Sequence, residues 1–322
     1  MTRRPSPVVA GWIVVVALTC GSAAFAQPLV TGDLTLYYDF DESVGDQILD
    51  ESGNGFDGTI VEGGANALVI DTVDPLRGPG AGVFQQSTNP LDDPVFVDVG
   101  GENITENFPE ELPTDAITMA AWLRLTANMS NDQSVFQARS QDGSFSVLFQ
   151  VQGDGRLRMT LREQQNNLTV VNVRRYTDGS DDNTAAVFPV GEWFHYAGTY
   201  DAGANLWALY FDGAMIASGS GTGHPIGDWG GVPSNFFAAG VGAIYDSNLR
   251  NLDGAVDELY VFHRALSAQE IETLHVPEPG STWLAVWALG SLWAVRRSIG
   301  PGTGPMSIPL RSRRRGHLPA RP

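Results

Sequence analysis

Short apolar or alternating segments, separated by turn dipeptides, constrain the fold of this 322-residue chain more than any other feature. Nine such segments lie at residues 34–40, 95–99, 117–125, 144–151, 156–161, 168–173, 193–200, 206–211 and 255–262. Asp-Gly dipeptides, which favour the positive φ angles of tight hairpins, begin at Asp57, Asp142, Asp154, Asp178 and Asp212. Many short strands with frequent turns predict an all-β fold, a sandwich or jelly roll of two packed antiparallel sheets.

One helix is predicted after the last of these segments, at residues 267–274. Ser267 and Glu270 have the spacing of a capping box, in which each side chain accepts a hydrogen bond from the other residue's backbone N–H. Leu266 and Ile271 hold the positions of a hydrophobic staple. We expect this short C-terminal helix to close the β body.

The first 26 residues have the features of a secretory signal peptide. Arg3 and Arg4 precede an apolar run at residues 8–18, and Ala24 and Ala26 hold the −3 and −1 positions of a signal peptidase site. The run is shorter than the roughly 20 apolar residues that span a bilayer. A permanent anchor and a lipoprotein site at Cys20 are the alternatives. Cys20 is the only cysteine, so cleavage leaves a mature protein with no thiol for a disulfide or a metal.

The body between the two ends, residues 27–275, is more acidic than the whole chain, whose net charge is −18. It contains 36 acidic residues against 10 arginines, a net charge of −26. Such a surface repels nucleic acid and anionic lipid and attracts divalent cations. We therefore expect no nucleic-acid partner, although general solubility explains the acidity equally well.

Five segments of the body resemble bacterial laminin-G-like, concanavalin A-like lectin/glucanase domains. They are YYDFDESVGDQILDESGNGFDGTI (37–60), AITMAAWLRL (116–125), WFHYAGTYD (193–201), LYFDG (209–213) and LDGAVDELYVFHRALSAQEIETL (252–274). The resemblance implies a jelly roll of two antiparallel sheets over residues 27–275. It does not imply one function, because this fold hosts lectins, adhesion modules, glycosidases and lyases.

The C-terminal end is similar to a PEP-CTERM sorting signal, which an exosortase recognises. An apolar stretch at 282–295 follows the Pro-Glu-Pro motif, and the residues that carry the resemblance are Pro277, Glu278, Pro279, Arg296 and Arg297. It implies a short transmembrane helix with cytoplasmic arginines, and so a transient membrane anchor on an exported surface or matrix protein. An ordinary single-span anchor is the alternative. The sorting signal covers residues 276–297, and residues 298–322, rich in Pro, Gly and Arg, are expected to be a disordered basic tail.

The sequence contains no recognisable catalytic constellation. Hydrolases that share this fold carry E-x-D-x-E on one strand, and no E-x-D occurs here. Asp257 and Glu258 are adjacent, so in a regular strand their side chains point to opposite faces. His195 lies within a strand pattern and is assigned a structural role. The domain is therefore predicted not to be an enzyme.

Two candidate sites remain. Asp50, Ser52 and Asn54 lie in a short loop rich in oxygen ligands, and the closing strand of such a sandwich would bring Asp257 near them. These four residues predict a Ca²⁺ site, because calcium takes 6–8 oxygen ligands. A simple turn is the alternative. Trp229 lies in a glycine-rich loop, where an exposed ring can stack on a sugar or plug the loop.

The leading hypothesis is a non-catalytic surface module that binds a glycan or extracellular polysaccharide. A glycoside hydrolase or polysaccharide lyase on the same fold is one alternative, and a structural exopolymer-associated protein without a ligand is the other. Signal peptidase, exosortase and, before processing, the membrane are the expected partners.

Overall fold

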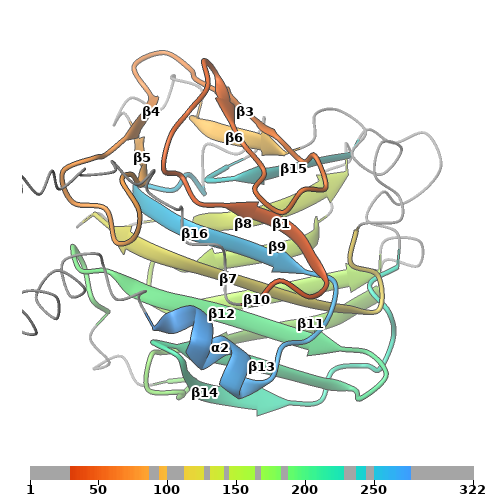
Figure 1. The fold of residues 1–322 in the computed structure, drawn as a ribbon. Coiled ribbons are helices and arrows are strands. Elements are labelled where there is room, and N and C mark those ends of the chain that lie inside the picture. Colours follow the sequence, from red (N-terminus) through yellow and green to blue (C-terminus); the bar gives the residue numbers. More distant parts are fainter. Residues whose placement is uncertain are drawn as a thin grey trace, which may run out of the picture. The chain divides into compact units, whose positions relative to one another are not determined.

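The computed structural model describes residues 30–86, 94–99, 112–126, 131–140, 145–163, 168–182, 188–227, 237–243 and 250–276. All of them lie in the first of the chain's two compact units. In this part of the chain, 16 strands form two antiparallel sheets, and the helix α2 (Ala268–His275) follows the last strand (Figure 1). This architecture confirms the predicted all-β sandwich with a short C-terminal helix.

The first sheet, sheet A, contains eight strands. They are β1 (Leu34–Tyr38), β4 (Ala67–Ile70), β5 (Gly82–Gln85), β7 (Ala116–Leu125), β12 (Phe194–Asp201), β13 (Leu206–Phe211), β14 (Ala214–Gly219) and β16 (Gly254–Phe262). The strand order is β14-β13-β12-β7-β16-β5-β4, and β1 pairs with one end of β16. The first and last strands of the domain are therefore neighbours.

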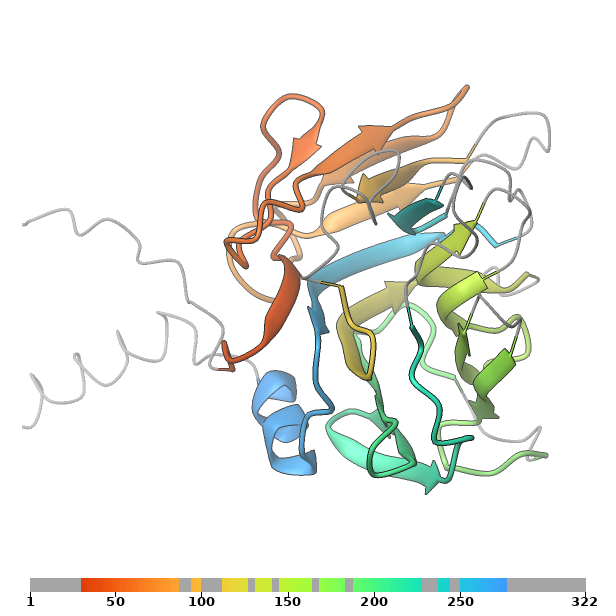
Figure 2. The same cartoon turned by 90° about the vertical axis from the view of Figure 1, so that its right-hand side faces the viewer.

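The second sheet, sheet B, also contains eight strands. They are β2 (Gln47–Ile48), β3 (Gly58–Val61), β6 (Phe96–Val99), β8 (Gln133–Ser140), β9 (Phe145–Val151), β10 (Leu157–Glu163), β11 (Leu168–Arg175) and β15 (Phe237–Val241). The strand order is β11-β10-β9-β8-β15-β6-β3-β2. Figure 2 shows the two sheets from the side, with α2 on the sheet A side.

The main core lies between the sheets because alternate residues of each strand point inward. Met119 and Leu123 of β7 and Met159 of β10 are fully buried there. The rings of Phe149 in sheet B and Tyr196 in sheet A stack with their centroids 3.9 Å apart. A continuous apolar layer of this kind accounts for the stability of a domain whose only cysteine lies outside the described residues.

A smaller apolar cluster covers the outer face of sheet A. Ile271 and Leu274 of α2 pack there against Tyr210 and Tyr260. Ser267 caps the helix, and both hydrogen bonds of the capping box are present. The predicted helix is therefore confirmed, and it seals one outer face of the sandwich.

Two local predictions about turns and strands had different outcomes. Asp212-Gly213 forms the β13–β14 hairpin, with φ angles of 47° and 73° at its two residues. Asp57-Gly58 is not a hairpin tip, since Gly58 begins β3, where an added Cβ would clash with the Val97 side chain. The segment at Asp142 lies outside the described residues.

Within the described residues, no helix is long and apolar enough to cross a membrane. The predicted apolar span at 282–295 lies outside them, as do the signal peptide and the basic tail.

Candidate functional site

The loop that carries Asp50 is closed by its own hydrogen bonds. Asp50 Oδ1 accepts from the backbone N–H of Tyr37 and of Ser52, both at 3.0 Å. Its Oδ2 accepts from the Ser52 hydroxyl at 2.7 Å and from the Phe56 N–H at 3.0 Å. Asn54 Nδ2 donates to the carbonyl of Leu34 at 2.8 Å. Asp50, Ser52 and Asn54 therefore lie together, where they attach the loop to β1.

Asp257 has a different set of partners. Its Oδ2 accepts from the N–H groups of Leu76 and Arg77 at 3.1 and 3.0 Å, so it clamps the loop before β5. Its Oδ1 is buried and has no hydrogen-bond partner. Burial raises the pKa of Asp257 to about 8, and the nearby Glu258 and Asp41 charges add to this rise.

These contacts bear on the predicted calcium site. The Asp50 carboxylate already accepts four hydrogen bonds, so this loop does not offer the free oxygens that a calcium ligand needs. Asp257 does offer one free oxygen, because its Oδ1 is buried without a hydrogen-bond partner. Among the described residues, no three His, Cys, Asp or Glu side chains converge in a metal-holding arrangement. Calcium binding stays a prediction, and Asp257 is the residue of the four that fits it.

The structure corrects the expectation that Asp257 and Glu258 point to opposite faces. The register of β16 against β7 shifts between Asp257 and Tyr260, and Glu258 adopts a φ of 53°. This β-bulge breaks the alternation of side chains. Both carboxylates consequently reach Arg77, Asp257 through the backbone N–H and Glu258 through the guanidinium at 3.3 Å. The adjacent acidic residues Asp257 and Glu258 interrupt the alternation of this strand in the sequence, but only the pairing with β7 shows that they form a bulge.

Arg77 also connects this buried cluster to the end of the domain. Its Nη2 donates to the carbonyl oxygens of Leu274 and Val276, at 2.8 and 2.5 Å. Glu258 accepts hydrogen bonds from the hydroxyls of Tyr37 and Tyr260 as well. The cluster therefore ties β1, the loop before β5, β16 and the end of α2 to one another, which is a structural role.

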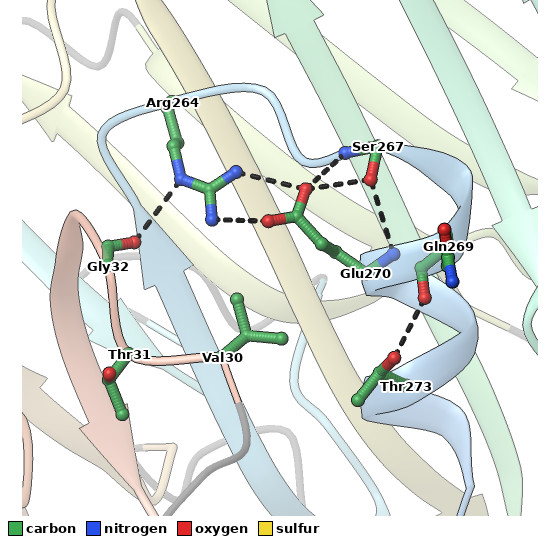
Figure 3. A pocket seen from close by; sticks show the side chains of 8 residues that line it. All are labelled: Val30, Thr31, Gly32, Arg264, Ser267, Gln269, Glu270 and Thr273. Carbon is green, nitrogen blue, oxygen red and sulfur yellow. Dashed lines mark hydrogen bonds and ion pairs between the residues drawn. The ribbon is translucent and has the colours of Figure 1, made fainter.

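A shallow depression lies between residues 30–32 and α2, and Figure 3 shows the side chains that line it. Arg264 donates to both carboxylate oxygens of Glu270, at 3.1 and 2.7 Å, and to the Gly32 carbonyl at 3.3 Å. The Arg264 partner holds the pKa of Glu270 down at about 2. The Arg264–Glu270 ion pair holds the start of the helix in place. Because both charges are already paired, the depression offers a ligand few free polar groups.

The outer face of sheet B differs, because polar residues cross it in two rows. The strand register places these residues opposite one another, and most of their neighbours along the strands belong to the core. The first row is Asn172, Thr160, Leu148, Gln137, Gly240, Asp98, Thr59 and Gln47. The second row is Arg174, Arg158, Gln150 and Ser134. We refer to these two rows as the polar face of sheet B.

Side-chain hydrogen bonds connect the residues of the polar face. Arg158 donates from Nε to the Thr160 hydroxyl at 3.1 Å and from Nη1 to Gln150 at 3.4 Å. Thr160 in turn donates to Asn172 at 3.1 Å. Gln137 is fully buried, and its Nε2 has no hydrogen-bond partner. The face therefore has buried polar groups at its centre and exposed ones, Asn172 among them, at the β11 edge.

The sequence did not single out this face, because no motif marks it. Alternating polar residues at 158, 160 and 162 were the available signal, but only the register between strands shows that they line up with residues on β9 and β11. Trp229, the predicted stacking residue, lies outside the described residues, as do Ala24, Ala26, Pro277, Glu278, Pro279, Arg296 and Arg297.

His195 lies on the other side of the molecule, on the outer face of sheet A. It is fully buried, with its ring 5.4 Å from that of Trp122 and 5.8 Å from that of His275. Neither ring nitrogen has a hydrogen-bond partner. Burial lowers the pKa of His195 to about 3, helped by the nearby His275 and Arg77 charges. This packing agrees with the structural role assigned from the sequence.

Comparison with known proteins identifies the fold family. The model of the Laminin_G_3 family, described as the concanavalin A-like lectin/glucanases superfamily, matches residues 100–272, which is more than half of the chain. The chain belongs to this superfamily. The match agrees with the two-sheet sandwich and with the resemblance of the five sequence segments. No curated protein gives a significant sequence match.

Several solved structures are similar to this superfamily member. Domain 4 of AbnA, a GH43 extracellular arabinanase from Geobacillus stearothermophilus, was solved in complex with arabinotriose. It is 19% identical, with a TM-score of 0.50 over 76% of this chain and 98% of that domain. The botulinum neurotoxin serotype G binding domain is 14% identical, with a TM-score of 0.47 over 75% of this chain and 50% of that one. These likenesses concern the fold alone.

Proposed function

We propose that this protein is an exported cell-surface or matrix protein whose concanavalin A-like domain binds a glycan or extracellular polysaccharide without cleaving it. The accessible β10–β11 end of the polar face of sheet B, with Asn172, Arg158 and Arg174, is the observation that carries the proposal. Sugar hydroxyls are recognised by a few well-placed polar groups on a rigid scaffold, and here those groups lie on paired strands. A domain of the same fold has been found with arabinotriose, so the fold can hold a linear sugar oligomer.

The composition of the face supports binding over hydrolysis. A retaining glycosidase needs two carboxyl groups about 5–5.5 Å apart, and an inverting one needs them about 6.5–9.5 Å apart. The two rows of the polar face contain a single carboxylate, Asp98. A glycan at the accessible β10–β11 end of these rows would therefore meet Asn172, Arg158 and Arg174, and no pair of carboxylates.

A glycan array probed with the full-length chain tests this proposal, with calcium and with EDTA. Asn172→Ala, at the exposed edge of the face, should weaken binding about two- to tenfold, the value of one lost hydrogen bond. Gln269→Ala on the exposed side of α2 is the matched control and should bind like the wild type.

The two alternatives give different results in the same experiment. Release of reducing ends or of unsaturated sugars from the bound glycan would identify a hydrolase or a lyase. Absence of binding to every glycan would favour a structural protein without a ligand.

A further inference from the structure

Four of the body's 10 arginines gather at the β10–β11 end of the polar face of sheet B. Arg158 and Arg174 lie directly opposite each other in the β10–β11 register. Arg162 lies four residues further along β10, and Arg250 is close enough to interact electrostatically with Arg158. We call Arg158, Arg162, Arg174 and Arg250 the arginine cluster. It is unexpected in a body whose net charge is −26.

This arrangement is unfavourable for the folded protein by itself. Like charges directly opposite on neighbouring strands repel each other and destabilise the sheet. Arg158 is also half-buried, and burial lowers the pKa of its guanidinium. Repulsion from Arg174, Arg250 and Arg162 lowers this pKa further. Asp132 is the one acidic group that opposes this effect.

The arginines of the cluster differ from others nearby in their partners. Arg156 forms an ion pair with Asp154, and Arg175 forms one with Asp181. Within the described residues, Arg158, Arg162 and Arg174 form no ion pair with a carboxylate. Arg158 is nonetheless held in place, by Thr160 and Gln150. A fixed guanidinium without an anion is a preorganised site for a planar acidic group, which it can bind through two parallel hydrogen bonds.

The first row of the polar face also contains a buried polar group without a partner. Gln137 lies in the neighbouring row, is fully buried, and its Nε2 has no hydrogen-bond partner. A buried donor without an acceptor costs stability unless something else supplies the acceptor. Among the described residues, the face therefore has three arginines without an ion pair, Arg158, Arg162 and Arg174, at its accessible edge, and the unsatisfied donor of Gln137 lies below the surface that a ligand contacts.

We propose that the arginine cluster binds the acidic groups of an anionic polysaccharide, carboxylated or sulfated, that lies along β10 and β11 at the accessible edge of the polar face of sheet B. This inference rests on the proposed function and names its ligand class. Arg158 and Arg162 are about 13 Å apart along the strand, which is longer than one sugar ring. Contact with both requires an oligomer, so affinity should rise with chain length.

A polysaccharide fits the cluster better than a nucleic acid does. Proteins that bind single strands stack the bases on aromatic side chains, and the two rows of the polar face contain no aromatic residue. The strongly acidic body also repels a densely charged phosphate backbone.

The test uses the purified full-length chain with polygalacturonate as the probe and fully methyl-esterified polygalacturonate as the matched uncharged polymer. Wild type should bind the acid form at least about tenfold more tightly than the ester, and high salt should remove most of the difference. Arg174→Gln, at an exposed position where folding is not at risk, should weaken binding at least about threefold. The double variant R158Q/R174Q should weaken it at least about tenfold.

Arg175→Gln is the matched control, because it removes the same charge from the next residue, which is already paired with Asp181. It should bind like the wild type. If the acid form and the ester bind equally, or if R174Q and R175Q behave alike, the inference is overturned while glycan binding itself stands. If single-stranded DNA competes as well as polygalacturonate does, the cluster is a general anion surface and the inference is also overturned. Absence of binding to acidic and neutral glycans alike refutes the proposed function.

Discussion

Replacing the buried His195 should change the pH dependence of stability in a direction that the structure determines. The folded protein keeps this ring neutral, with a pKa of about 3 against an ordinary value of 6.5. An unfolded chain takes up the proton as the pH falls below 6.5, and the folded chain does not. The unfolded state therefore binds more protons between pH 6.5 and pH 3, and the free energy of unfolding falls as the solution is acidified through this window.

The magnitude follows from the two pKa values. At pH 7.5 the His195 ring is neutral in the folded and the unfolded state, so its protonation contributes almost nothing to the free energy of unfolding. At pH 5 the unfolded ring is almost fully protonated, and the wild-type free energy of unfolding should be about 2 kcal/mol lower on this account. Asp41 and Asp257 act in the opposite direction, because burial raises their pKa values to about 7 and about 8. Comparison with a variant is therefore needed to isolate the histidine.

His195→Gln provides that comparison, since it keeps a polar side chain of similar size that does not titrate. Urea unfolding followed by tryptophan fluorescence gives the free energy at each pH. The destabilisation by H195Q should be smaller at pH 5 than at pH 7.5 by about 2 kcal/mol. His224→Gln, at an exposed loop position, is the control and should show no such change. A destabilisation by H195Q that is equal at both pH values would refute the account of a buried neutral ring.

Three further outcomes are expected. Excess calcium should raise the melting temperature by a few degrees relative to EDTA. Asp257→Asn should remove most of this shift and Asp178→Asn should not, and an unchanged melting curve in EDTA would exclude a specific site. Ser267→Ala should lower the free energy of unfolding by about 1 kcal/mol in urea titrations, because it removes the helix N-cap; no measurable loss would contradict this. Mass spectrometry of surface-extracted protein should find cleavage after Ala26 and near Pro277, and an intact C-terminus would refute the sorting signal.

Local features of the fold could be predicted from the sequence alone. The alternation of residues 206–211 and the Asp212-Gly213 turn predict the β13–β14 hairpin, since positive φ angles at the turn are a local requirement. Ser267 and Glu270 predict the start of α2 for the same reason, because a capping box involves residues three apart. The short strands β2 to β5 were missed, since segments of two to four residues carry too little periodicity to be distinguished from loops. The strands β8 and β15 were missed as well.

The candidate sites depended on contacts between residues far apart in the sequence. The bulge in β16 is defined only against β7, and it brings Asp257 and Glu258 to the same arginine, contrary to the alternation of a regular strand. The opposition of Arg158 and Arg174 exists only because of the β10–β11 register, which a shift of one residue would abolish. The sequence by itself predicted nine of the strands and the helix cap, because these depend on local spacing, and its motifs carried the resemblance to the superfamily. Only the tertiary structure decided which polar side chains share a face, because strand register depends on how the whole core packs.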